Sequence, residues 1–392
     1  MKKTFDYLII GAGSAGCVLA NRLSKDKKTS VCLLESGPKS DTWKVDMPSA
    51  LLYTMHDPKY NWKYYSEPEP HLNNRRIFCP RGKMLGGCSS HNGMVFVRGN
   101  PLDFERWASY DLPKWSYKNV LPYFKKLESW SGGENLYRGG SGPLKVNRSK
   151  IDNAFPLAKS LIKAAAEAGY DTFEDSNGFK QDGFGTFDVT IDNGKRQGVS
   201  RAYLNEIKGY KNLTIEHNTD VSKIIFKEKK AIGVEIKRNN QSEIYYCNKE
   251  VILSSGSINS PKILQLSGIG DEKVLNQNGI DIINHLPGVG KNLQDHLEIY
   301  IQHKSKTKDT LYNLSTNYFT QAIEGAKWFL LKKGMLTYSH LEVGGFVKTS
   351  EKYKHPNLQL HFFPSLVINH GLTNPSFDGF QFHASPNRPK SR

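Results

Sequence analysis

The stretch FDYLIIGAGSAGCVLANRLS, residues 5–24, decides the fold of this chain. Its apolar opening predicts a buried parallel strand over 5–10, and the amphipathic pattern after it predicts a helix that ends near Leu23. The glycines between the two elements have G-x-G-x-x-G spacing: Gly11, Gly13 and Gly16. A strand, a glycine turn and a helix in this order predict a dinucleotide-binding βαβ unit.

Each residue of the turn has its own task in such a unit. Gly11 permits the tight turn, Gly13 lets the backbone approach a pyrophosphate, and Gly16 lets the helix pack on the strand. We expect the pyrophosphate at the amino end of the helix, beside Ser14 and Ala15, because unpaired backbone N–H groups point there.

An acidic residue stands at the distance that ribose recognition requires. A second apolar strand is predicted over 31–34, and Glu35 follows it directly. Its carboxylate can accept hydrogen bonds from ribose hydroxyls. The competing interpretation is a glycine-rich turn that binds no ligand. The motif by itself does not choose between NAD and FAD.

Composition limits the class of protein. The 392 residues can form two or more lobes with large cores. No apolar run is long enough to span a bilayer, and the strand begins too near Met1 to leave room for a leader. The five cysteines form no C-x-x-C pair, so we expect neither a metal site nor disulfides, and a cytoplasmic protein.

The net charge of +16 raises the question of an anionic partner. The lysines are dispersed along the chain rather than gathered in one aromatic-interleaved patch, which favours a solvated surface over nucleic-acid binding. Peripheral contact with the inner face of the plasma membrane remains an alternative.

The rest of the chain predicts an α/β fold. We expect a discontinuous Rossmann-like lobe and a second lobe with a mixed or antiparallel sheet and helices. Residues 1–155 and 200–300 are assigned to the dinucleotide-binding domain, and 156–199 and 301–392 to a substrate-binding domain. Helices are predicted over 155–168, 261–266 and 322–331, a meander of strands from Leu213, and a further strand over 249–254.

Two further segments resemble the signatures of a known family. PRGKMLGGCSSHNGMVFVRGN, residues 80–100, and GSINSPKILQLSGIG, residues 256–270, resemble those of the glucose–methanol–choline (GMC) oxidoreductases. Other segments resemble the choline dehydrogenase branch of that family, namely 61–70, 73–76, 287–296, 339–346 and 378–392. The resemblance implies FAD as the cofactor.

It also implies a reaction. The family oxidises an alcohol by passing hydride from carbon to flavin N5. The most similar branch implies the conversion of choline to betaine aldehyde, and other primary alcohols remain alternatives. The electron acceptor, a quinone or carrier in a dehydrogenase or oxygen in an oxidase, is not indicated by any motif.

The resemblance assigns further residues to the cofactor. Backbone groups are expected against the flavin or the adenine at Gly86, Gly87, Asn92, Gly93, Met94, Val95 and Val221. The GGCSSHN form of the first signature resembles that of choline oxidases, in which the matching histidine is bonded covalently to the flavin. His91 is therefore a candidate for covalent attachment, and a hydrogen bond beside the flavin is the alternative.

Candidates for the substrate site follow from the choline branch. Trp62, Tyr64 and Tyr65 can attract a quaternary ammonium through their aromatic faces, and Glu342 can supply a counter-charge. His361 is expected to orient the substrate hydroxyl, as in similar chains. The alternatives are ordinary packing for the aromatic residues, an internal ion pair for Glu342 and a core position for His361.

One element of the family pattern is missing. Its general base comes from a late histidine motif, and this sequence contains no such motif. We therefore expect no catalytic base in these residues, and the base beyond Arg392 in an interrupted chain. The alternative is a catalytically inactive FAD-binding fragment.

Overall fold

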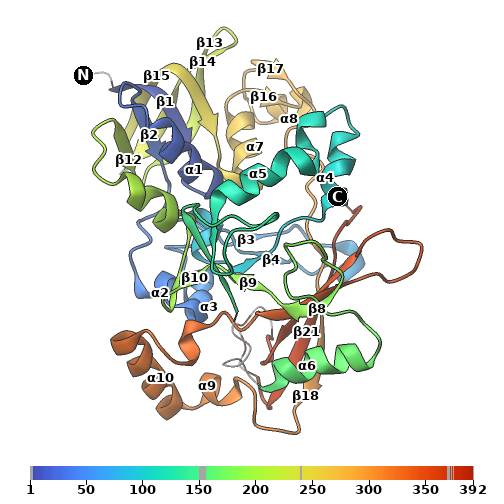
Figure 1. Cartoon of the computed structure of the whole chain (residues 1–392). Coiled ribbons are helices and arrows are strands. Elements are labelled where there is room, and N and C mark those ends of the chain that lie inside the picture. Colours follow the sequence, from blue (N-terminus) through green and yellow to red (C-terminus); the bar gives the residue numbers. More distant parts are fainter. Residues whose placement is uncertain are drawn as a thin grey trace.

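The structure is a computed structural model that describes residues 3–149, 156–238, 241–368, 371, 373 and 375–391. Figure 1 shows a mixed sheet around β1 at one end of the molecule and a second sheet with α6, α9 and α10 at the other. Small sheets and short helices lie between them. The predicted combination of a Rossmann-like lobe and an antiparallel lobe is confirmed.

The first sheet has six strands in the order β12-β2-β1-β15-β14-β13. These are β1 (Lys3–Ile10), β2 (Val31–Leu34), β12 (Leu213–Glu216), β13 (Asp220–Lys227), β14 (Lys230–Arg238) and β15 (Gln241–Leu253). The first four strands of this order, β12, β2, β1 and β15, pair in parallel, and β14 and β13 join them in antiparallel orientation. Helix α1 (Ser14–Leu23) follows β1, as predicted.

Alternate residues of β1 and β2 enter two different cores. Leu8 and Leu34 pack with β13 and β14 on one face, while Ile9 and Leu33 pack with α1 on the other. Burial on both faces explains why these strands are continuous apolar runs.

The predicted meander requires a correction at its start. β12 pairs in parallel with β2, so the meander begins only at β13. The strand predicted over 249–254 is the end of the 13-residue β15, which pairs with β14 in its first half and with β1 in its second.

The second large sheet is antiparallel throughout, in the order β18-β21-β20-β19-β8. Its strands are β8 (Gly183–Thr186), β18 (Ile299–Lys304), β19 (Val343–Val347), β20 (Leu358–Phe363) and β21 (Gly379–Pro386). The helices beside it are α6 (Pro156–Glu167), α9 (Tyr312–Thr316) and α10 (Tyr318–Leu331). The helix predicted from Phe155 is confirmed from Pro156, and Phe155 itself lies outside the described residues.

A four-stranded sheet joins the two halves. Its order is β5-β9-β7-β6, with β5 (Val95–Phe96), β6 (Glu128–Trp130), β7 (Leu144–Arg148) and β9 (Asp188–Val189). β9 belongs to the predicted substrate-binding domain and its neighbours to the predicted FAD-binding domain. The division into domains stays a prediction, and its first boundary touches residues 150–155, which lie outside the described ranges.

The remaining elements are short and fill the connections. They are α2 (Trp43–Asp46), α3 (Leu51–His56), β3 (Tyr64–Tyr65), β4 (Phe78–Cys79), α4 (Pro101–Ala108), α5 (Tyr117–Leu127), β10 (Ile191–Asp192), β11 (Lys195–Arg196), α7 (Gly256–Leu266), β16 (Ile269–Gly270), α8 (Glu272–Gln277) and β17 (Asn284–His285). Within the described part of the chain, no helix is both long and apolar enough to cross a membrane.

Candidate functional site

A cavity of about 930 Å³ opens beside the carboxyl ends of β1 and β2. Nine of the residues predicted from the sequence line it: Gly11, Gly13, Ser14, Ala15, Glu35, Trp62, Tyr64, Gly87 and Val221. The other predicted residues lie outside its lining: Gly16, Tyr65, Gly86, His91, Asn92, Gly93, Met94, Val95, Glu342 and His361. The cavity thus gathers most candidates for the ADP half of the cofactor together with Trp62 and Tyr64, whereas most flavin-ring candidates and the other substrate candidates lie outside it.

The glycines of the first turn are required by close packing. Gly11 has a φ of +94°, and a Cβ there would lie 2.7 Å from the carbonyl oxygen of Ser254. A Cβ at Gly16 would lie 1.9 Å from the oxygen of Gly11. At Gly13 the nearest atom would be 4.0 Å away, so a side chain there would enter the cavity. These positions match the turn, the helix contact and the open approach that a pyrophosphate requires.

Two helices begin at this cavity. Ser14 lies in the first turn of α1, and Gly256 and Ser257 in the first turn of α7. Neither helix has an acidic residue in its first turn. Two unneutralised amino ends at one cavity favour a diphosphate, because both dipoles present partial positive charge.

The amino end of α7 was missed as a site. The signature at residues 256–270 was recognised in the sequence, but its residues were not assigned to the cofactor. The structure places Ser255, Ser257 and Lys262 in the cavity lining. The glycine at the start of α7 was the signal that could have identified this second anion-binding turn.

Glu35 is held rigidly at the end of β2. Its side chain is buried and accepts hydrogen bonds from the backbone N–H groups of Ala12 (3.0 Å) and Gly37 (2.9 Å). Burial raises the pKa of its carboxyl to about 7, against the effect of these two donors. Each oxygen keeps lone pairs for further donors, so the carboxylate fits the predicted ribose contact.

The turn over residues 86–95 carries the second group of cofactor candidates. Gly86, Gly87 and Met94 all have positive φ. His91 is 5 % exposed, and its Nδ1 has no hydrogen-bond partner among the described residues. Burial lowers the pKa of His91 to about 4, so its ring is neutral at pH 7. A neutral imidazole with an unpartnered nitrogen fits either form of the predicted flavin contact.

The aromatic candidates already have partners. The rings of Trp62 and Tyr64 are stacked, with centroids 6.0 Å apart. Nζ of Lys83 lies 4.8 Å from the Trp62 ring, so one face of this indole already holds a cation. The Tyr64 hydroxyl donates to Oδ1 of Asn259 at 2.6 Å, and Tyr65 is half exposed.

Glu342 lines a different cavity, of about 650 Å³. The carboxylate is 7 % exposed and accepts from the backbone N–H (2.8 Å) and hydroxyl (3.1 Å) of Ser339. Burial raises its pKa. Three lysines also line this cavity, Lys327, Lys332 and Lys333. The structure therefore does not bring Glu342 together with Trp62 and Tyr64.

His361 lies in β20 within the antiparallel sheet. Its ring centroid is 5.2 Å from that of Phe187, and its Nδ1 has no partner among the residues described. Burial, with a smaller effect of His383, lowers the pKa of His361 to about 4. The neutral ring could orient a hydroxyl, but neither cavity includes it in its lining.

Comparisons with known proteins agree with this geometry. The family model described as GMC oxidoreductase matches residues 5–298. The chain is 43 % identical over 392 residues to the oxygen-dependent choline dehydrogenase of Photobacterium profundum, covering all of this chain and 69 % of that protein. It is 44 % identical to the mitochondrial choline dehydrogenase of Homo sapiens, covering 99 % of this chain and 66 % of that protein.

Solved structures show the same fold. The crystal structure of pyridoxine 4-oxidase from Mesorbium loti superposes with a TM-score of 0.86 at 25 % identity, covering 99 % of this chain and 72 % of that one. A formate oxidase superposes with a TM-score of 0.89 at 24 % identity, covering 100 % and 74 %. All of these proteins are longer than the chain described here.

Proposed function

The chain belongs to the GMC oxidoreductases, an FAD-dependent family that acts on CH–OH groups, and from this premise we propose that it binds FAD and oxidises a primary alcohol, choline first. The observation that carries the proposal is the 930 Å³ cavity, where the G-x-G-x-x-G turn, Glu35 and the amino ends of two helices meet. The choline dehydrogenases that it resembles support the choice of substrate.

We assign the two halves of FAD to two groups of residues. The amino ends of α1 and α7 would hold the diphosphate, Glu35 the ribose and the backbone at Val221 the adenine. The turn over residues 86–95, from Gly86 and Gly87 to Val95, would hold the isoalloxazine ring. FAD supplies the acceptor for the hydride, and the protein supplies binding, orientation and electrostatics.

His91 is the proposed point of covalent attachment. Its neutral ring and unpartnered Nδ1 support this role, and a non-covalent contact with the flavin remains the alternative. Acid precipitation of the FAD-loaded protein separates the two. Yellow colour in the pellet is expected, with loss of that colour in His91→Asn. Free FAD in the supernatant would contradict covalent attachment.

For the substrate ammonium we favour Glu342 over the aromatic group. A buried carboxylate that lines a cavity attracts a quaternary ammonium, because little water screens the pair, in competition with the three lysines of the same lining. The face of Trp62 would first have to release Lys83. His361 is proposed to orient the hydroxyl. The aromatic site formed by Trp62, Tyr64 and Tyr65 is the competing assignment.

Anaerobic reduction of the flavin tests the reaction. Choline should bleach the flavin absorbance, whereas 3,3-dimethyl-1-butanol, an uncharged analogue of similar shape, should act more slowly. Equal rates of flavin reduction by the two alcohols would contradict a site for the substrate ammonium. Bound FAD that no alcohol reduces would favour the inactive FAD-binding alternative, and failure to bind FAD would contradict the proposal as a whole.

The electron acceptor and the location are also part of the proposal. Oxygen consumption with choline would indicate an oxidase, and reduction of a quinone alone would indicate a dehydrogenase. The net charge of +16 supports peripheral contact with an anionic membrane surface on the cytoplasmic side. Sedimentation with anionic vesicles, compared with neutral ones, tests that contact.

A further inference from the structure

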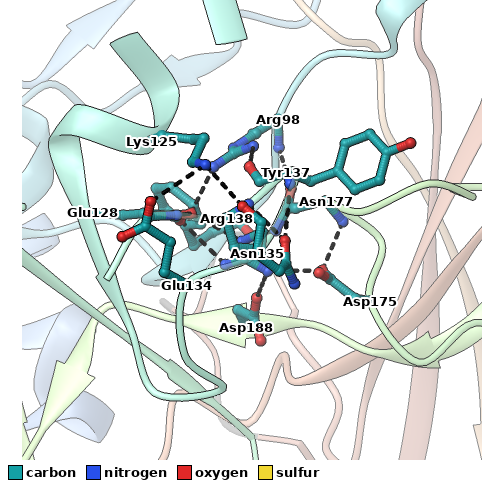
Figure 2. A network of polar contacts seen from close by, with 12 residues as sticks. Arg98, Lys125, Glu128, Glu134, Asn135, Tyr137, Arg138, Asp175, Asn177 and Asp188 are labelled. Carbon is teal, nitrogen blue, oxygen red and sulfur yellow. Dashed lines mark hydrogen bonds and ion pairs between the residues drawn. The ribbon is translucent and has the colours of Figure 1, made fainter. Parts of the chain in front are cut away.

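Among the residues that the structure describes, two arginine side chains are completely buried, and their charged surroundings differ. Arg138 is 0 % exposed and Arg196 is 1 % exposed. Arg138 contacts three carboxylates: Glu128 at 2.9 Å, Asp175 at 2.7 Å and Asp188 at 2.6 Å. Figure 2 shows these acids around the guanidinium. They raise the pKa of Arg138 despite its burial. Its charge is thus cancelled locally.

Arg196 has only uncharged partners among the described residues. Its Nε donates to the carbonyl of Val45 at 3.0 Å. Its Nη1 donates to the carbonyl of Ser89 (3.3 Å) and to the carbonyl (2.7 Å) and side-chain oxygen (2.9 Å) of Asn92. Nη2 has no hydrogen-bond partner in the described part of the chain. Burial lowers the pKa of Arg196 to about 9, so it is still charged at pH 7.

The acid that influences Arg196 most is engaged elsewhere. Asp46 forms an ion pair with Arg201, and its second oxygen lies 3.7 Å from Nζ of Lys195. The charge of the Arg196 guanidinium is therefore offset only in part, by Asp46, and it forms no ion pair with a described residue. The field of such a charge is strong in a buried site, because no water screens it.

The residues that Arg196 holds lie on both sides of His91. Ser89 precedes this histidine by two residues, and Asn92 follows it directly. Asn92 in turn accepts from the backbone N–H of Met94 at 3.1 Å, which shapes the turn toward Val95. The contacts of one guanidinium therefore fix the whole turn that carries His91.

We infer that Arg196 is a positioning residue: its guanidinium fixes the 89–92 turn that presents His91 to the flavin, and its buried charge adds to the effect of burial in keeping the His91 ring neutral. The inference rests on the proposed function only in naming the flavin as what the turn faces. Burial is the main reason that the pKa of His91 is lowered, and the positive charge of Arg196 lowers it further, because a second positive charge nearby is unfavourable. Arg81 acts on His91 in the same direction, but its side chain is a third exposed and lies 3.5 Å from Asp295.

Titration of His91 in flavin-free protein tests the charge directly. Histidine NMR would be recorded on the wild type and on Arg196→Lys and Arg196→Gln. Lysine keeps the charge but cannot reach all the carbonyl groups, and glutamine loses both. We expect the His91 midpoint to stay near 4 in the wild type and in Arg196→Lys. In Arg196→Gln it should rise part of the way towards the ordinary value of about 6.5, because burial of the ring remains.

Two further variants serve as a substitute in case Arg196→Gln does not fold and as a control. Asn92→Asp places a carboxylate beside Arg196 with almost no change of shape, so it should fold even if Arg196→Gln does not. It should also raise the midpoint, both because it offsets the charge of Arg196 and because its carboxylate is next to His91. Arg81→Gln is the matched control and should change the midpoint less than Arg196→Gln. A midpoint that stays near 4 in Asn92→Asp and in every folded Arg196 variant would overturn the inference.

FAD retention is the second readout. If the charge matters, Arg196→Lys should keep more bound FAD than Arg196→Gln, whereas a purely structural brace would fail equally in both. Because the titration needs no flavin, its result does not depend on the proposed function. A shifted midpoint in protein that never binds FAD would contradict the proposed function and leave the charge effect intact.

Discussion

Replacing Glu128 by glutamine should destabilise the protein strongly. Glu128 is fully buried and accepts four hydrogen bonds. Three reach Oε1, from Arg98 (2.6 Å), Arg138 Nε (2.9 Å) and the backbone N–H of Gly139 (2.9 Å). The fourth reaches Oε2, from Arg138 Nη2 at 3.1 Å. Figure 2 shows Glu128 between the two arginines.

The magnitude follows from what glutamine leaves behind. Its amide oxygen can keep the three donors at Oε1, but its NH₂ group would then face the N–H of Arg138. Arg138 retains Asp175 and Asp188, whereas Arg98, 5 % exposed, loses its carboxylate. Breaking a buried pair costs about 3–5 kcal/mol. Because half of the network survives, we expect about 3 kcal/mol.

Denaturant unfolding of the FAD-loaded protein measures this loss. The matched control is Glu167→Gln on α6, which breaks an exposed pair with Lys163 at 3.6 Å. That change should cost no more than about 0.5 kcal/mol. A loss below about 1 kcal/mol for Glu128→Gln, or equal losses in the two variants, would refute the claim that this network braces the fold.

Three further predictions concern the two cavities. The affinity for FAD should rise as the pH is raised through about 7 and then level off. Burial holds the pKa of Glu35 near 7 in the FAD-free protein, whereas ribose donors favour its ionised form, so FAD binding below pH 7 releases a proton. Calorimetry at pH 6 and 8 should show this proton release in the wild type and not in Glu35→Gln. Gly16→Ala should cost about 3 kcal/mol of folding free energy through overpacking, whereas Gly13→Ala should cost about 1 kcal/mol or less yet weaken FAD binding at least about tenfold. Thermal melts measure the first effect and FAD titration the second. Equal melting temperatures of the two variants would contradict the packing argument. Lys83→Met should leave choline affinity within about twofold if the substrate ammonium does not use the face of Trp62, where the lysine now lies; tighter choline binding would favour the aromatic site instead.

The first βαβ unit could be predicted from the sequence because its signals are local. The apolar run before Gly11, the glycine spacing and the apolar run before Glu35 each act over a few residues, and β1, α1 and β2 formed where they predict. The pairing of β12 with β2 could not be predicted in the same way. Leu213 reads as one more strand of a meander, and nothing near it in the sequence specifies a parallel partner almost two hundred residues away.

The same dependence on local signals explains which residues of the candidate site could be predicted from the sequence. Glycines could be assigned because backbone approach restricts the residue type, and Gly11, Gly13 and Gly87 all line the cavity. Glu342 and Trp62 were grouped by the chemistry of a presumed ligand, which carries no information on distance, and they line different cavities. Arg196 was not identified at all, since an arginine in a polar stretch gives no sign that folding will bury it.

Burial of charge is what distinguishes the two ends of the proposed cofactor site. At the diphosphate end, the partial positive charge comes from the backbone N–H groups at the amino ends of α1 and α7. No charged side chain has to be buried to supply it. At the turn over residues 86–95 no helix of comparable length begins, and a whole guanidinium, Arg196, is buried instead. A cancelled arginine such as Arg138 could brace that turn equally well but would add no charge to the burial that disfavours a proton on His91. The lack of a carboxylate among the hydrogen-bond partners of Arg196 therefore strengthens a preference for neutral His91 that burial already establishes.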